Sequence, residues 1–176
     1  EEAAAITYGG LLASDCLRRG KINDCRRILV YGASGAIGTS AVQLAKAAGV
    51  YVVAVCSGKN REMMLDLGAD EVWDYTKQFD VPNNDTFDLV FDAVGENKTS
   101  ELKTACKTAL TNQGKYLSVD QGMLRSEVDA LKHINQLIAR GQYQAVIDKA
   151  FSLDDIVAAH EYVDLGHKRG NVVVTL

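Results

Sequence analysis

The residues best suited to chemistry in this sequence form a glycine-spaced turn. The turn consists of Gly32, Ala33, Ser34, Gly35, Ala36, Ile37 and Gly38. Small residues let the chain turn sharply and let a pyrophosphate group approach the backbone, where a larger side chain would block it. Backbone N–H groups at the start of a following helix would point at the phosphates, with the positive end of the helix dipole behind them. The spacing therefore predicts the phosphate-binding turn of a dinucleotide site.

Two elements must flank this turn to hold it in place. Residues 27–31 form an apolar run of strand length, and residues 39–49 have the small and apolar composition of a helix that ends at Gly49. Gly38, one turn into that helix, allows the helix to lie close on the strand. Strand, glycine turn and helix together are the context that distinguishes a dinucleotide site from an ordinary glycine-rich turn.

A second group of polar residues follows the predicted strand at 51–56. NAD sites place an acidic residue here, about 20 residues past the glycine turn, to bind the ribose 2′-hydroxyl. Ser57, Lys59 and Arg61 instead offer a hydroxyl and two cations, which suit a 2′-phosphate. The sequence favours NADP(H) as the cofactor. The alternative is that these residues form a solvated basic turn before a helix.

A third group lies where the predicted fourth and fifth strands end. Val94 and Gly95 follow the fourth of these strands, and Ser118 lies at the end of the fifth. Ligands bind at the carboxyl ends of the strands in open α/β sheets, so backbone contacts with the ribose and carboxamide are predicted here. For Asp92 we favour a structural role as an acid that caps the turn.

The sequence identifies no catalytic acid or base and predicts no metal site. His133, His160 and His167 are each expected to be surface or packing histidines. The cysteines are widely spaced and form no C-x-x-C pair, which predicts reduced thiols and neither a disulfide framework nor a zinc site. They are Cys16, Cys25, Cys56 and Cys106.

The order of elements predicts an α/β fold with a Rossmann-type doubly wound parallel sheet. Nearly continuous β-branched runs such as 51–56 are typical of strands that are buried on both faces. Right-handed crossovers give the strand order 3-2-1-4-5. The further strands are expected at 71–74, 88–92 and 115–119, and the helices at 61–67 and 100–111, the latter closed by Gly114.

The chain divides into three predicted parts. Residues 1–26 are a helical lead-in of two short pieces around a bend at Gly9–Gly10, residues 27–122 are the dinucleotide-binding domain, and residues 123–176 are a C-terminal extension. The extension reads as helix, strand, helix and strand, at 128–141, 144–148, 152–165 and 171–176.

Composition excludes several classes of function. A net charge of −4 argues against nucleic acid as a partner, because phosphate neutralisation requires a basic surface. No apolar run approaches the roughly 18 residues of a membrane helix. The chain opens with Glu1 and carries no leader pattern. We therefore expect a domain fragment of a cytoplasmic protein.

Several motifs stand in an order that resembles one family. They are Gly32–Thr39, Ala41–Lys46, Leu67–Asp70, Asp74–Tyr75, Phe91–Gly95, Val146–Asp148, Ala158–His160 and Gly166–Val173. In this order they resemble the medium-chain dehydrogenase/reductases, and most closely the zinc-free quinone oxidoreductase branch. The resemblance covers nearly the whole chain.

The resemblance implies NADPH-dependent hydride transfer to a quinone, an enone or another small carbonyl compound. It also implies that Tyr75 lies beside the adenosine phosphate, although a loop tyrosine can equally be a packing residue. In such proteins a GroES-like barrel precedes the equivalent of Glu1 and forms the substrate cleft, and residues from about Leu124 belong partly to that catalytic domain. The connection after Val119 is too short for the strand that these relatives often use to dimerise, so an oligomer would need another contact.

Two hypotheses from other classes remain open. The chain could be a stand-alone nucleotide-binding or sensor module whose partner supplies the rest of the site. It could also be a remnant of a zinc alcohol dehydrogenase whose metal ligands lie outside this sequence.

Overall fold

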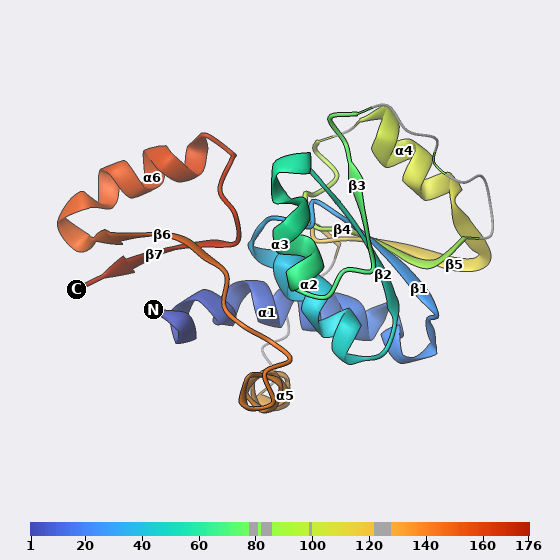
Figure 1. The fold of residues 1–176 in the computed structure, drawn as a ribbon, viewed down its shortest axis with the longest axis horizontal. Helices are drawn as coiled ribbons and strands as arrows, with labels where there is room; N and C mark the ends of the chain where they lie inside the picture. The colour runs from blue at the N-terminus through green and yellow to red at the C-terminus, as the bar shows by residue number, and fades with distance from the viewer. Residues whose placement is uncertain (78–80, 82–85, 99, 122–127) are drawn as a thin grey trace.

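The fold is built on one parallel sheet. The computed structural model describes residues 1–77, 81, 86–98, 100–121 and 128–176. The strands of the sheet are β1 (Arg27–Tyr31), β2 (Tyr51–Cys56), β3 (Glu71–Asp74), β4 (Phe87–Asp92) and β5 (Leu110–Ser118). They lie in the order β3-β2-β1-β4-β5, which confirms the predicted order (Figure 1). The apolar residues of the central strands are buried on both faces, as their continuous runs require.

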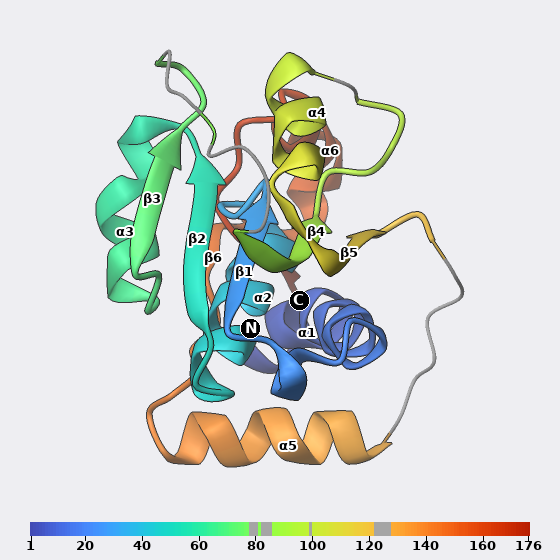
Figure 2. The ribbon, with the colours of Figure 1, turned by 90° about the vertical axis from the view of Figure 1, so that its right-hand side faces the viewer.

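Helices cover the two faces of the sheet unequally. Side chains of α2 (Ala36–Ala47), α1 (Glu2–Arg19), α3 (Arg61–Asp66) and α5 (Val128–Ala139) share one apolar cluster with the sheet. The opposite face packs against α4 (Glu101–Thr108) in a smaller cluster that includes Trp73 and Phe87. In Figure 2, α5 runs across the bottom of the view, beneath α1. Short 3₁₀ helices occur at Ile22–Asp24, Gly58–Asn60 and Leu153–Asp155. Among the described residues, no helix combines the length and the apolar character that a membrane span needs.

The expected bend at Gly9–Gly10 is wrong, because α1 is one continuous helix from Glu2 to Arg19. Both glycines are buried in the interior of the helix. A Cβ atom added at Gly9 would lie 2.7 Å from the carbonyl oxygen of Ala36, at the start of α2. Gly9 is therefore a contact residue that lets α1 cross close to the helix that follows the glycine turn.

The expected boundary between α4 and β5 is also wrong. Helix α4 ends at Thr108, and β5 already begins at Leu110, so Gly114 lies inside the strand. The pairing of β4 with β5 shifts in register between Phe87 and Leu89, which marks a bulge. A Cβ atom added at Gly114 would lie 2.7 Å from the carbonyl oxygen of Phe87. The glycine permits the close approach of backbone at the bulge.

The C-terminal residues form a small unit of their own, seen on the left of Figure 1. Strands β6 (Ile147–Ser152) and β7 (Asn171–Thr175) pair in parallel, and α6 (Ile156–Asp164) connects them. The expected strand at 144–148 begins three positions too early, because the backbone of Gln144 is bonded to the side chain of Gln43. The predicted domain boundary at 122/123 and the short connection after Val119 fall outside the described residues.

Candidate functional site

The glycine turn joins β1 to α2 and is tightly packed against both elements. Gly32 has a φ of +77°, and its N–H and that of Ala33 both donate to the carbonyl of Val55 on β2. A Cβ atom added at Gly38 would lie 2.6 Å from the Cα of Ala33. Gly38 therefore lets the helix lie close on the turn that follows β1, whereas the prediction placed this close contact on the strand.

The start of α2 is open toward the carboxyl edge of the sheet. Gly35 is the N-cap residue, and no side chain caps the helix there. A Cβ atom added at Gly35 would meet only the carbonyl oxygen of Gly32, at 3.7 Å. Helix geometry leaves the first N–H groups without intrahelical partners, so the helix start offers donors to an anion. Of the neighbouring residues, Ala33 is buried, whereas Ser34, Ala36 and Ile37 are partly exposed.

The three residues predicted to select the cofactor lie together. Ser57, Lys59 and Arg61 line one cavity of about 470 Å³ at the ends of β2 and β3. The guanidinium of Arg61 donates to the carbonyl of Val72 at 3.0 Å, which holds its side chain along β3. Thr76 and Lys77 line the same cavity. The structure therefore brings a hydroxyl and cations together beside the second strand.

An acidic residue also lies at this cavity, and the sequence interpretation missed it. Asp74 ends β3 and pairs in register with Cys56 at the end of β2. Its carboxylate accepts hydrogen bonds from the hydroxyl and the N–H of Thr76, at 2.7 and 3.0 Å. These bonds from Thr76, with one from the backbone of Gly58, hold the pKa of Asp74 below its usual range. The register of the neighbouring strand is the signal that could have revealed this residue.

Tyr75 follows Asp74 and is 55% exposed. Its N–H donates to the carbonyl of Cys56 at 3.2 Å, which places the tyrosine next to the loop that begins at Ser57. It is not among the residues that line the cavity.

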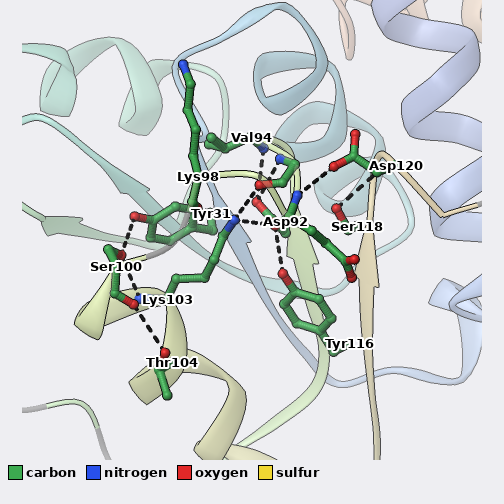
Figure 3. Close-up of polar contacts among 12 residues, drawn as sticks. Tyr31, Asp92, Val94, Lys98, Ser100, Lys103, Thr104, Tyr116, Ser118 and Asp120 are labelled. Atoms are coloured by element: carbon green, nitrogen blue, oxygen red, sulfur yellow. Dashed lines mark hydrogen bonds and ion pairs between the residues drawn. The ribbon is translucent and has the colours of Figure 1, made fainter.

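The turn after β4 lies over the glycine turn. A Cβ atom added at Gly32 would overlap the side chain of Val94, so these two turns are in contact. Asp92 is fully buried, and its Oδ1 accepts the N–H groups of Val94 and Gly95 at 3.0 and 3.3 Å (Figure 3). The predicted structural role of Asp92 is confirmed by these bonds.

Ser118 ends β5 beside Asp92, its register partner on β4. It is fully buried, and its hydroxyl accepts the N–H of Asp120 at 3.4 Å. Asp120 in turn accepts the N–H of Glu96 at 2.6 Å. The ends of β4 and β5 are thus connected by hydrogen bonds, and the side chain of Ser118 takes part in that connection.

Comparison with known proteins shows which family matches this sequence. A family model described as zinc-binding dehydrogenase matches residues 36–140, which include α2 and every strand from β2 to β5, and a second model of the same description matches residues 121–174. The chain belongs to the zinc-binding dehydrogenase family. Among curated relatives, the bovine (Bos taurus) mitochondrial NAD(P)H oxidoreductase RTN4IP1 is 31% identical over 99% of this chain and 55% of its own length. The tomato (Solanum lycopersicum) 2-methylene-furan-3-one reductase is 31% identical over 98% of this chain and 46% of its own length.

Solved structures of related proteins share the fold. The quinone oxidoreductase of Thermus thermophilus, determined also in complex with NADPH, is 25% identical with a TM-score of 0.74 and aligns with 100% of this chain and 66% of its own. The quinone oxidoreductase of Coxiella burnetii has a TM-score of 0.79 at 22% identity, over 99% of this chain and 60% of its own. This zinc-binding dehydrogenase chain spans about half the length of the curated relatives it matches.

The name of the zinc-binding dehydrogenase family raises the question of a metal site. In the part of the chain that the structure describes, no group of three or more His, Cys, Asp or Glu residues could hold a metal ion. His133 lies on α5, His160 on α6 and His167 before β7, so the histidines do not converge. The described residues do not fit zinc.

Proposed function

We propose that this chain binds NADP(H) at the carboxyl edge of its parallel sheet, as the dinucleotide-binding part of an oxidoreductase. The observation that carries the proposal is the uncapped start of α2 at Gly35, where an added Cβ would meet only the carbonyl oxygen of Gly32, at 3.7 Å. A nicotinamide dinucleotide fits this geometry, because its pyrophosphate can approach the backbone there and accept hydrogen bonds from the helix start. The cations at Lys59 and Arg61 support the phosphorylated cofactor.

Different parts of the cofactor would contact different segments along the carboxyl edge of the sheet. The glycine turn, from Ala33 to Gly38, would hold the pyrophosphate, and the loop after β2 would hold the adenosine ribose with its 2′-phosphate. Tyr75 would lie beside that phosphate. Val94, Gly95 and Ser118 would bound the nicotinamide half, with Ser118 acting through the backbone because its side chain is buried.

The reaction would be transfer of a hydride to a quinone, an enone or another small carbonyl compound, without zinc. Relatives support this substrate class by name: one is a 2-methylene-furan-3-one reductase, and another is an NADPH-dependent alkenal/one oxidoreductase. The bound nicotinamide would supply the hydride, and the protein would supply orientation. The residues that choose the substrate would lie mainly outside this chain, which by itself would be inactive or nearly so.

The proposed division into a lead-in (1–26), a dinucleotide domain (27–122) and an extension (123–176) belongs to the same proposal. A cytoplasmic location stays a prediction, since some relatives are named as mitochondrial or chloroplastic. The partners proposed are the dinucleotide and a small molecule.

Calorimetric titration of the chain with NADPH and NADH tests the proposal. We expect NADPH to bind at least about tenfold more tightly, because charge-assisted bonds to a 2′-phosphate add roughly 1.5–3 kcal/mol. Lys59→Ala should weaken NADPH binding and leave NADH binding unchanged. Lys132→Ala, on the exposed face of α5, is the matched control and should change neither. The proposal would be refuted if neither cofactor bound, or if NADH bound clearly more tightly than NADPH.

A further inference from the structure

Lys103, on α4, is a buried lysine that none of the predicted functions requires. Its side chain is only 4% exposed, and buried lysines are rare unless they are paired. The ammonium has three donors, and each has an acceptor: Oδ2 of Asp92 at 2.7 Å, the carbonyl of Gly95 at 2.6 Å and the carbonyl of Lys98 at 2.7 Å (Figure 3). The lysine thus bonds to both ends of the turn that follows β4.

Asp92 completes the network from the strand. Its Oδ1 accepts the N–H groups of Val94 and Gly95, and its Oδ2 accepts the hydroxyl of Tyr116 at 2.7 Å besides pairing with Lys103. A buried ion pair is weak evidence for a gain in stability, because desolvation offsets the attraction between the charges. The pair does, however, determine the position of every polar group that it bonds. Its evident effect is on the shape of the turn.

Helix α4, which carries Lys103, is itself anchored to the central strand. The hydroxyls of Tyr31, at the end of β1, and Ser100 are 3.0 Å apart, and Ser100 caps the helix by accepting the N–H of Lys103 at 3.0 Å. Figure 3 shows these bonds converging on the space between α4 and the ends of the strands. The position of the Lys103 ammonium is therefore set by β1 and β4 together.

The position of this turn along the carboxyl edge of the sheet indicates which half of the dinucleotide would contact it. In a doubly wound sheet the dinucleotide crosses the point where the strand order reverses, with its adenosine half over the second strand. The other half must then lie over β4 and β5. Asp92 accepts the N–H groups of Val94 and Gly95, and Lys103 donates to the carbonyls of Gly95 and Lys98, so the turn presents to a ligand mainly the partly exposed side chain of Val94.

We propose that Lys103 is a positioning residue that, through Asp92 and the carbonyls of Gly95 and Lys98, holds the turn after β4 in the shape that receives the nicotinamide half of the cofactor. This inference rests on the proposed function. It assigns Lys103 no contact with the cofactor. A loss of Lys103 should therefore affect one half of the dinucleotide and spare the other.

The test compares two ligands on one variant. Calorimetry with NADPH and with 2′,5′-ADP, which lacks the nicotinamide half, is carried out on the chain with Lys103→Met. We expect NADPH to bind about tenfold more weakly, because a less ordered turn would cost roughly the free energy of one hydrogen bond. The affinity for 2′,5′-ADP should equal that of the wild type. The change in NADPH fluorescence on binding, which reports the surroundings of the nicotinamide, should shrink. Lys132→Met, on the exposed face of α5 and away from this network, is the control and should behave as the wild type.

A second variant keeps the inference testable if the single one fails to fold. Asp92→Asn with Lys103→Met leaves no unpaired buried charge and retains an oxygen that can accept the N–H groups of Val94 and Gly95. We expect the same selective loss of NADPH affinity. Unchanged NADPH binding by a folded variant, or an equal loss for both ligands, would overturn the inference and leave the proposed function standing. Failure of the wild type to bind either ligand would instead refute the proposed function.

Discussion

In the proposed function, cofactor preference would depend on side chains at the end of β2, and Ser57 is the one that directly follows the strand. Ser57→Asp would place a carboxylate where NAD sites carry one. We expect the variant to bind NADPH at least about tenfold more weakly, because the acid repels a 2′-phosphate, and NADH more tightly. Titration with both cofactors measures the ratio. Ser14→Asp, on α1, is the control, and an unchanged ratio in the Ser57 variant would show that this loop does not choose the cofactor.

The cysteines provide a pH-dependent prediction. Burial raises the pKa of Cys56 to about 11 and that of Cys106 to about 12, and it also raises that of the buried Cys16. Since the thiolate is the reactive form, these thiols should not react with a disulfide reagent at pH 8. Burial and the nearby Asp88 raise the pKa of Cys25 as well, but its side chain is partly exposed. We therefore expect Cys25 alone to react in the folded chain, and all four cysteines to react after unfolding.

Cys25→Ser should abolish the reaction of the folded chain, and rapid labelling of any other cysteine would contradict the prediction.

The raised pKa values of the buried cysteines also predict how the stability of the fold changes with pH. Above about pH 9 the folded chain retains protons that the unfolded chain loses, so the free energy of unfolding should fall as the pH rises.

At the scale of elements, the position of α1 depends on Gly9. Alanine favours a helix by about 1 kcal/mol over glycine, so propensity alone predicts that Gly9→Ala stabilises the chain. The added Cβ would lie 2.7 Å from a backbone oxygen of α2, which cannot move without moving the glycine turn. We expect a net loss of about 1–3 kcal/mol, measured by urea unfolding. Thr7→Ala, exposed on the same helix, should be neutral or slightly stabilising. A more stable Gly9→Ala variant would show that this contact is not tight.

The strands could be predicted from the sequence because their burial on both faces leaves long β-branched runs. The errors arose where a residue serves a partner far away in the sequence. The sequence predicts a bend at Gly9 and a helix stop at Gly114, whereas each glycine makes room for a backbone oxygen that is distant in the sequence. Lys103 in the sequence is one more cation on a polar helix, and only the packing of α4 against β4 reveals its burial.

The candidate site could be predicted in part for the same reason. The glycine turn and the group at Ser57, Lys59 and Arg61 are local in sequence, and the structure brings the second group to one cavity. Asp74 at the same cavity comes from a neighbouring strand, so its place depends on the register of β2 with β3.

At the scale of the whole molecule, buried polar contacts join the C-terminal unit to α2. The side-chain amide of Gln43 accepts the N–H of Gln144 at 2.8 Å and donates to its carbonyl at 3.1 Å. Nearby, the hydroxyls of Ser40 and Tyr143 are 2.7 Å apart. These bonds hold the segment between α5 and β6 against α2.

Gln43→Leu should therefore leave two backbone groups of Gln144 without partners. We expect a loss of about 1–3 kcal/mol in the free energy of unfolding, since two hydrogen bonds are lost and each contributes about 0.5–1.5 kcal/mol where water can reach the freed groups of the exposed Gln144. Hydrogen exchange should also quicken in β6 and β7 ahead of the five-stranded sheet. Gln136→Leu, exposed on α5, is the control. Equal stability of the two variants would show that the amide contact is not needed.

One contact links the C-terminal unit directly to the candidate ligand site. The N–H of Gly170, just before β7, donates to the carbonyl of Ser34 in the glycine turn at 2.8 Å. Gly170 also forms an isolated parallel β-bridge with Gly35. A ligand that binds the turn more tightly when β7 is in contact with it would stabilise that contact by the same free energy as the contact adds to ligand binding. If the proposed cofactor binds the glycine turn in this conformation, we expect the exchange of the Gly170 amide to slow on binding, which hydrogen exchange with and without NADPH measures.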